Sequence, residues 1–120
     1  MKSLILVATD DLRLKRAIEA VALAESAVCF GIAQGDHLVE RVRSFNPFML
    51  IADLSSETSE WIFKHASEIK VVRHNFPMVA CVAESQESQR LRAQYAGFDH
   101  VLGKRQFLKK LPEIIRRYLR

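Results

Sequence analysis

Residues 48–53 of this chain read FMLIAD, and this stretch decides the fold. Five apolar residues in a row match the length of a strand that is covered on both faces, which is typical of a parallel sheet. Residues 4–8 (LILVA) and 78–83 (MVACVA) are two more runs of this kind. Two further strands, at 28–32 and 101–102, are weaker because the first alternates in polarity and the second is short.

Helical periodicity fills the intervals between the predicted strands. Apolar residues recur there at three- and four-residue steps, the pattern of a helix with one buried face. Asp10 or Asp11 is expected to cap the first helix, Asp36 is expected to cap the second, and Pro112 lies within the last. Because strands and helices alternate with short links, the sequence predicts an α/β domain with a parallel sheet and helices on both of its faces. The helices are expected at 12–25, 36–45, 61–72, 88–96 and 106–120.

Composition is ordinary for a globular domain, with 120 residues, 49% of them hydrophobic and 27% charged. The net charge is +4, and the excess of basic residues near the chain end favours an acidic partner surface. Cys29 and Cys81 lie in apolar runs, so we expect buried thiols in a reducing, cytoplasmic environment. The apolar run 4–8 is too short for a signal peptide or a membrane span, and no membrane association is expected.

Acidic residues follow two of the predicted strands. Asp10 and Asp11 come after the first strand, Asp53 ends the third, and Lys104 follows the fifth. In a parallel α/β sheet these side chains would converge at the carboxyl ends of the strands. Converging carboxylates remain ionised together if a cation joins them, and an oxygen-rich site beside a lysine suits Mg²⁺ and a phosphoryl group. The two turn residues have an alternative role as the cap of the first helix, where a carboxylate is favoured.

Over essentially the whole chain, this pattern resembles the receiver domain of response regulators in two-component signalling. The resemblance is carried by the order and separation of the stretches 6–12, 35–38 with 46–53, 77–83 and 96–104. It implies a flavodoxin-like, doubly wound α/β fold, in which a five-stranded parallel sheet of order 2-1-3-4-5 carries five helices on its two faces. A single receiver-like domain is expected over residues 1–120.

The resemblance also implies roles for individual residues. Asp53 would be the phospho-acceptor, and Lys104 would pair with the acyl phosphate. Mg²⁺ would be held by carboxylates of the acidic turn, Asp10 and Asp11, by Asp53, and by the backbone carbonyl of Ser55.

Several residues depart from the family's pattern. Thr9 takes the place of one of two acidic turn residues, unless a shift of register by one makes residues 10–11 the pair. Val82 stands where the family has a Thr or Ser, whose hydrogen bond to a charged group is typically worth about 1.5–3 kcal/mol. Val101 stands where an aromatic residue moves inward when that hydroxyl is drawn to the phosphate. Arg105 replaces the proline after the lysine. The sequence therefore predicts an atypical or degenerate receiver with a weakened Mg²⁺ site and altered switch positions.

The leading functional hypothesis is a signalling module rather than an enzyme. It would take part in phosphorelay signal transduction through Asp53, or act independently of phosphate by protein–protein interaction. The partner would be a histidine kinase, a phosphotransfer protein, an effector or a second copy, bound at the face of the fourth helix, fifth strand and fifth helix. The basic residues expected on this face are Arg90, Arg92, Arg105, Lys109 and Arg116.

Two other classes of function are less well supported by the sequence. The alternative is a nucleic-acid-binding module that uses the basic C-terminal helix, but no aromatic residues interleave with its basic residues in a single-strand-binding pattern. An enzyme acting on a phosphorylated small molecule is disfavoured, because residues 9–12 (TDDL) occupy the place of a glycine-rich phosphate loop and present negative charge there.

Overall fold

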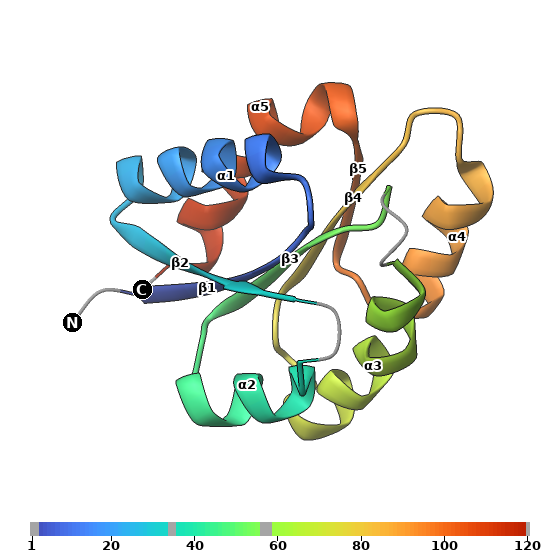
Figure 1. The fold of residues 1–120 in the computed structure, drawn as a ribbon, viewed down its shortest axis with the longest axis horizontal. Coiled ribbons are helices and arrows are strands. Elements are labelled where there is room, and N and C mark those ends of the chain that lie inside the picture. Colours follow the sequence, from blue (N-terminus) through green and yellow to red (C-terminus); the bar gives the residue numbers. More distant parts are fainter. Residues whose placement is uncertain (1–2, 34–35, 56–58, 120) are drawn as a thin grey trace.

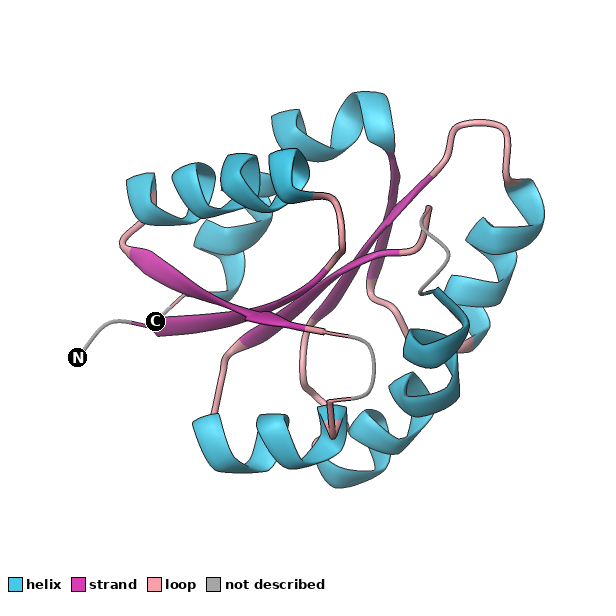
Figure 2. Ribbon diagram, in the orientation of Figure 1, coloured by secondary structure: helices cyan, strands magenta, loops and turns pink. Residues whose placement is uncertain are grey.

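Parallel strands form the centre of the molecule in the computed structural model, which describes residues 3–33, 36–55 and 59–119 (Figures 1 and 2). The strands are β1 (Ser3–Ala8), β2 (Ala27–Ile32), β3 (Met49–Asp53), β4 (Met78–Val82) and β5 (His100–Gly103). They pair in the spatial order β2-β1-β3-β4-β5, and every pairing is parallel. The predicted flavodoxin-like order 2-1-3-4-5 is therefore confirmed.

The helices cover the two faces of this sheet unequally (Figure 1). They are α1 (Leu12–Ala24), α2 (Leu38–Phe45), α3 (Ser59–Val72), α4 (Glu87–Tyr95) and α5 (Lys104–Tyr118). In the described ranges, α1 and α5 pack on one face and α2, α3 and α4 on the other. Ile5 and Val7 of β1 point toward the first pair, whereas Leu6 and Ala8 point toward the other three helices. Because alternate side chains of a strand serve opposite faces, a continuous apolar run is what a doubly covered strand requires.

Four helices begin at a residue other than the expected one. Helices α3 and α4 begin two residues and one residue earlier, at Ser59 and Glu87. Helix α2 begins at Leu38, and Asp36 does not cap it, because the Asp36 carboxylate accepts the backbone N–H of Ala33 at 2.9 Å. Helix α5 begins at Lys104, directly after β5, rather than near Gln106. It continues through Pro112 as one helix. Gly35, in the stretch 35–38 that carries part of the resemblance, lies outside the described residues.

The two cysteines differ in burial. Cys81 is buried within β4, as expected, whereas Cys29 on the edge strand β2 is only half-buried, and both are free thiols. None of the helices in the described ranges has both the length and the apolar character needed to cross a membrane.

Phe107 and Leu108 on α5 provide a test of the core. Phe107 is fully buried against the sheet and Leu108 is 37% exposed. Phe107→Ala is expected to lower the free energy of unfolding by about 3–5 kcal/mol, because it leaves a cavity where a ring was packed. Leu108→Ala is the matched control and should cost less than about 1 kcal/mol. Urea denaturation followed by circular dichroism measures both, and similar losses for the two variants would contradict this packing.

Candidate functional site at the carboxyl ends of the strands

The register of the sheet brings the predicted acceptor and the predicted lysine to the same edge. Asp53 at the end of β3 lies opposite Cys81, and Gly103 at the end of β5 lies opposite Val82. Lys104 follows Gly103 directly, so β4 alone separates it from Asp53. The pKa of the Cys81 thiol is raised to about 12, first by burial and then by the Asp53 carboxylate, while Lys104 acts in the opposite direction. The charges at the ends of β3 and β5 therefore both act on this one β4 side chain.

Asp53 is a buried carboxylate whose two oxygens both accept hydrogen bonds. Its exposed fraction is 3%. The hydroxyl of Thr9 donates to Oδ2 at 2.9 Å, and the backbone N–H of Ser55 donates to Oδ1 at 3.0 Å. The Ser55 hydroxyl donates to the same Oδ1 at 2.5 Å. A carboxylate removed from water needs such donors, because an uncompensated buried charge is very costly.

The turn after β1 divides its polar groups between Asp53 and α1. Besides donating to Asp53, the Thr9 hydroxyl accepts the backbone N–H of Asp11 at 3.0 Å. The Asp11 carboxylate accepts the N–H groups of Arg13 and Leu14 at 3.0 and 3.2 Å, so it caps α1. Asp10 is exposed. Of the two capping alternatives, Asp11 fills the role, and a neutral threonine takes the place beside Asp53.

This arrangement offers Mg²⁺ fewer carboxylates than the resemblance implies, because Asp11 caps α1 and Thr9 is neutral. Mg²⁺ demands near-octahedral oxygen coordination and is held by one or two carboxylates with water and phosphate oxygens. Asp11 is used as a helix cap, Thr9 carries no charge, and both oxygens of Asp53 accept hydrogen bonds. Across the described part of the chain, no three His, Cys, Asp or Glu side chains are grouped to hold a metal. Of the predicted ligands Asp10, Asp11, Asp53 and Ser55, the hydrogen bonds join only the last two, and magnesium binding stays a prediction.

Glu84 is a further residue at the carboxyl ends of the strands, and the sequence did not predict a role for it. Its carboxylate accepts the backbone N–H of Arg105 at 2.7 Å, in the first turn of α5. It also lies over Gly103, where an added Cβ would come within 2.5 Å of a Glu84 oxygen. A negative charge is stabilised at a helix N-terminus. The sequence signal for this contact is that residue 105 is an arginine rather than a proline, because a proline there would have no backbone N–H to donate to Glu84.

The two predicted switch positions are apolar and packed. Val82 is fully buried in β4, and Val101 is half-buried against the same core cluster. Neither side chain carries a group that donates a hydrogen bond. The hydroxyl and the aromatic ring that the family uses to report phosphorylation are therefore both absent from these two positions.

Two of the five predicted basic residues point away from the expected face. Arg92 on α4 turns toward α3 and donates to both carboxylate oxygens of Glu60, at 2.6 and 2.7 Å. Its guanidinium lies 4.1 Å from the centre of the Phe63 ring. Arg116 on α5 donates to Glu25, just after α1, at 3.0 Å.

The other three basic residues remain on the side formed by α4, β5 and α5. Arg90 donates to the backbone carbonyl of Val101 at 2.9 Å, which ties α4 to β5. Arg105 and Lys109 have exposed side chains on α5. The expected interaction face is therefore less basic than its sequence suggests.

Solved response-regulator structures have the same arrangement of strands and helices. A candidate response regulator from Chloroflexus aurantiacus J-10-fl has a TM-score of 0.83 and 16% identity, covering 99% of this chain and 98% of that one. An orphan response regulator of H. pylori has a TM-score of 0.75 and 15% identity, with coverage of 98% and 97%. The beryllofluoride-activated DrrB receiver domain has a TM-score of 0.79 and 17% identity, with coverage of 99% and 98%.

These similarities confirm the resemblance at the level of the fold. The chain has the fold of a response-regulator receiver domain. No family model matches its sequence, and no curated protein matches it. With sequence identities of 15–17%, the similarity to these structures is one of fold.

The hydrogen bond from Thr9 to Asp53 is testable by substitution. Thr9→Val removes the donor and leaves a buried carboxylate oxygen with one bond fewer, so the free energy of unfolding should fall by about 1–3 kcal/mol. Thr9→Ser keeps the hydroxyl and should retain most of the stability. Urea denaturation at neutral pH measures both variants, and equal stabilities would show that the hydroxyl does not stabilise Asp53.

The contact between Glu84 and the start of α5 is testable by a double-mutant cycle. Glu84→Ala removes the acceptor and should cost about 0.5–2 kcal/mol, as for other helix caps. Arg105→Pro removes the donor in the first helical turn, where proline is tolerated. If the two groups act through one hydrogen bond, the double variant should lose less stability than the sum of the single losses. Additive losses would contradict the contact, and Ser85→Ala, at an exposed neighbour, serves as the control.

Proposed function

We propose that this chain is a receiver-type signalling domain that acts by protein contact, without a phosphoryl-driven switch. The observation that carries the proposal is that both carboxylate oxygens of Asp53 accept hydrogen bonds, from Thr9 and from Ser55. In this reading, the carboxylate that would accept a phosphoryl group serves instead to join the ends of β1 and β3. The role is one of signalling rather than catalysis, and a cytoplasmic location remains a prediction from the sequence.

The chemistry of phosphoryl transfer supports this interpretation. Attack on a phosphorus atom needs an available carboxylate oxygen and positive charge to neutralise the transferring group. In this chain Ser55 and Thr9 already donate to the two oxygens of Asp53, and the neutral Thr9 brings no charge to hold a cation beside Asp53, which leaves Lys104 as the nearby positive charge. Val82 and Val101 also lack the groups that would couple a phosphate to the rest of the domain. A bound phosphoryl group would therefore shift the conformational equilibrium very little.

The surface proposed for partner binding lies on α4, β5 and α5. Its basic members are Arg90, Arg105 and Lys109, and its exposed apolar members are Leu91 and Leu108, at 50% and 37% exposure. Basic and apolar groups together suit a partner surface that is acidic and partly hydrophobic. The partner class is a kinase, a phosphotransfer protein or an effector that recognises this fold.

Phosphorelay through Asp53 is the second candidate function. It is favoured by the register that places Asp53 and Lys104 at the same edge of the sheet. Nucleic-acid binding finds no support, because Arg116 and Arg117 of the basic helix are already paired with Glu25 and Glu113.

Amide NMR spectra with Mg²⁺ and beryllofluoride separate the two candidates. For the wild-type chain we expect unchanged amide signals at Asp53, Val82 and Lys104, because the carboxylate is already satisfied. The double variant Thr9→Asp with Val82→Thr rebuilds the acidic turn and the hydroxyl, and it should gain a response. Val82→Thr alone is the matched control. Large stoichiometric shifts around Asp53 in the wild type would favour the phosphorelay.

A further inference from the structure

Strand β2 forms an unprotected edge of the sheet. It pairs with β1 alone, on one side. Between described residues, no hydrogen bond outside this ladder reaches the backbone of Ala27–Ile32. An exposed edge pairs readily with another strand unless charge, proline or a bulge protects it. The sequence of β2, AVCFGI, contains neither a charged residue nor a proline.

The opposite edge of the sheet is protected by comparison. Strand β5 has only four residues. Its Val101 carbonyl already accepts the guanidinium of Arg90 at 2.9 Å. A short edge strand with a carbonyl occupied by a charged side chain is a poor template for a further strand. Of the two edges, β2 is therefore the one open to strand addition.

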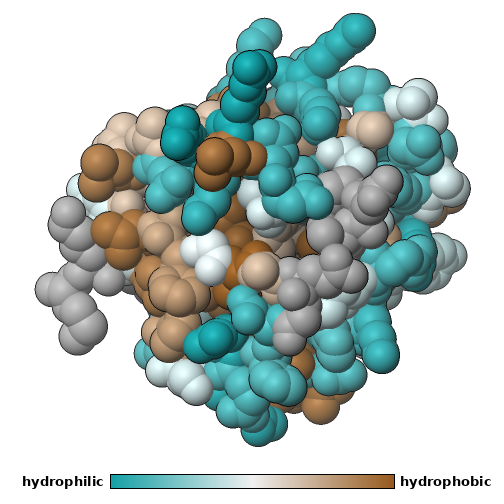
Figure 3. Space-filling view, viewed as in Figure 1, coloured by the Kyte–Doolittle hydropathy of each residue, from teal (hydrophilic) through white to brown (hydrophobic). Residues whose placement is uncertain are grey.

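Apolar side chains gather around the β2 edge, which faces the viewer in Figure 3. Leu23 at the end of α1 is 60% exposed, and Phe30 of β2 is 41% exposed. The Phe30 ring packs edge-on against Phe45 of α2, with 4.8 Å between ring centres. The edge thus has exposed apolar groups above and below the plane of the sheet, as a buried interface requires.

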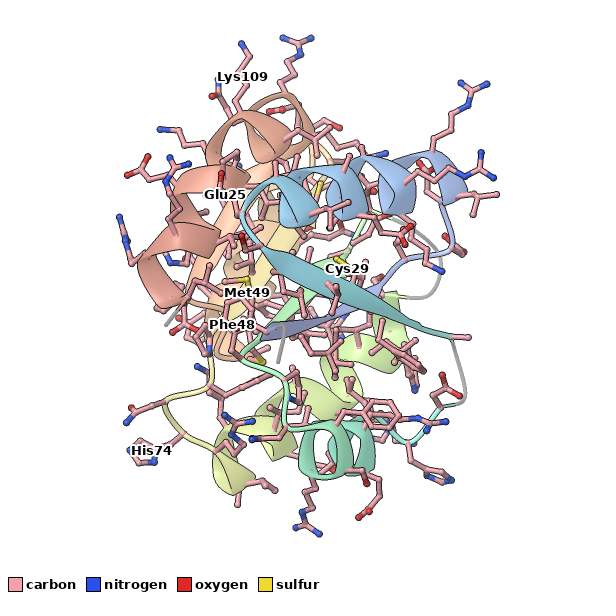
Figure 4. All side chains as sticks on the ribbon, turned by 90° about the vertical axis from the view of Figure 1, so that its left-hand side faces the viewer. Glu25, Cys29, Phe48, Met49, His74 and Lys109 are labelled. Carbon is pink, nitrogen blue, oxygen red and sulfur yellow. The ribbon has the colours of Figure 1, made fainter. Side chains whose placement is uncertain are left out.

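Two side chains of opposite charge on α1 lie over different ends of β2. The Lys15 ammonium on α1 is 2.7 Å from the position that a Cβ on Gly31 would take. Glu19, one helical turn later, lines a hollow with Ala27 and the residues that follow it. Cys29 lies at the middle of this strand (Figure 4). The pKa of its thiol is raised to about 11, first by burial and then by the charge of Glu19, while Lys15 acts in the opposite direction. No ion pair joins Lys15 to Glu19 between the described residues of one chain.

The positions of Lys15 and Glu19 allow the two charges of one copy to pair with the opposite charges of a second copy. In an antiparallel pair, directly opposite residues point to the same face of the sheet. Two copies of β2 can therefore pair symmetrically, with one residue of each copy directly opposite the same residue of the other. When Cys29 lies on the twofold axis, Ala27 of each copy faces Gly31 of the other. Lys15 of each copy then lies beside Glu19 of the other, so that two ion pairs form across one isologous interface.

We propose that two copies of this chain associate through β2, in an antiparallel register centred on Cys29, to join their sheets into one. The interface combines strand pairing, the apolar flanks Leu23 and Phe30, and reciprocal Lys15–Glu19 contacts. It lies at the edge opposite β5 and is separate from the partner surface on α4, β5 and α5, so it does not rest on the proposed function.

Charge exchange tests the interface. Lys15→Glu and Glu19→Lys each place like charges opposite one another twice, and each should raise the dimer dissociation constant by about tenfold or more. An equimolar mixture of the two variants restores both opposite-charge contacts and should form a heterodimer. Arg16→Glu makes the same charge change at the neighbouring exposed position and should leave the dimer intact. Sedimentation velocity over a range of concentrations measures all four samples.

Disulfide trapping tests the register. Opposite residues of an antiparallel pair have Cα atoms about 4.5–5.5 Å apart, which is within disulfide range. Oxidation with copper phenanthroline should therefore yield a covalent dimer in the wild type and in Cys81→Ser, but not in Cys29→Ser. A wild-type chain that sediments as a monomer at every concentration, or a mixture that shows no rescue, would overturn the interface. A dimer without the Cys29 cross-link would overturn the register.

Discussion

The burial of the Asp53 carboxylate, at the end of the central strand β3, constrains the other residues at the carboxyl ends of the strands. Asp53 is 3% exposed, so its charge must be satisfied by hydrogen-bond donors or by a cation. The pairing of β1 with β3 places Ala8 opposite Ala52, which puts Thr9 beside Asp53 and within reach of its Oδ2. A neutral hydroxyl and the groups of Ser55 are among the donors to this carboxylate, so contacts within the chain stabilise the charge of Asp53.

This way of satisfying Asp53 affects the neighbouring elements. In the turn after β1, Thr9 donates to Asp53 and Asp11 stabilises the start of α1. On the other side of β4, the Glu84 carboxylate holds the first turn of α5. The segments that follow β1, β4 and β5 are thus each fixed by contacts within the chain. The apolar side chains at Val82 and Val101 are consistent with the proposed function, in which the domain presents a constant surface to a partner rather than alternating between two states.

The sequence predicted the strands well because each buried strand is a continuous apolar run, a property of the run itself. The strand order came from the resemblance to receiver domains, since local pattern does not specify which strands are neighbours. Contacts between distant residues were the main source of error. Arg92 was expected on the partner face, but its direction is set by Glu60, 32 residues away. Asp36 was expected to cap α2, but the N–H of Ala33 competes for the same carboxylate. The replacement at Thr9 was recognised, whereas its bond to Asp53 depends on strand pairing across 44 residues.

The most direct test of the central claim is a titration with Mn²⁺ followed by amide NMR, because a paramagnetic ion broadens the signals of nearby nuclei. If hydrogen bonds rather than a cation satisfy Asp53, the amide signals of Thr9, Asp53 and Ser55 should stay as sharp as those of the sheet interior. Selective broadening centred on Asp53, reversed by a chelator, would show that a metal binds there and would contradict the account.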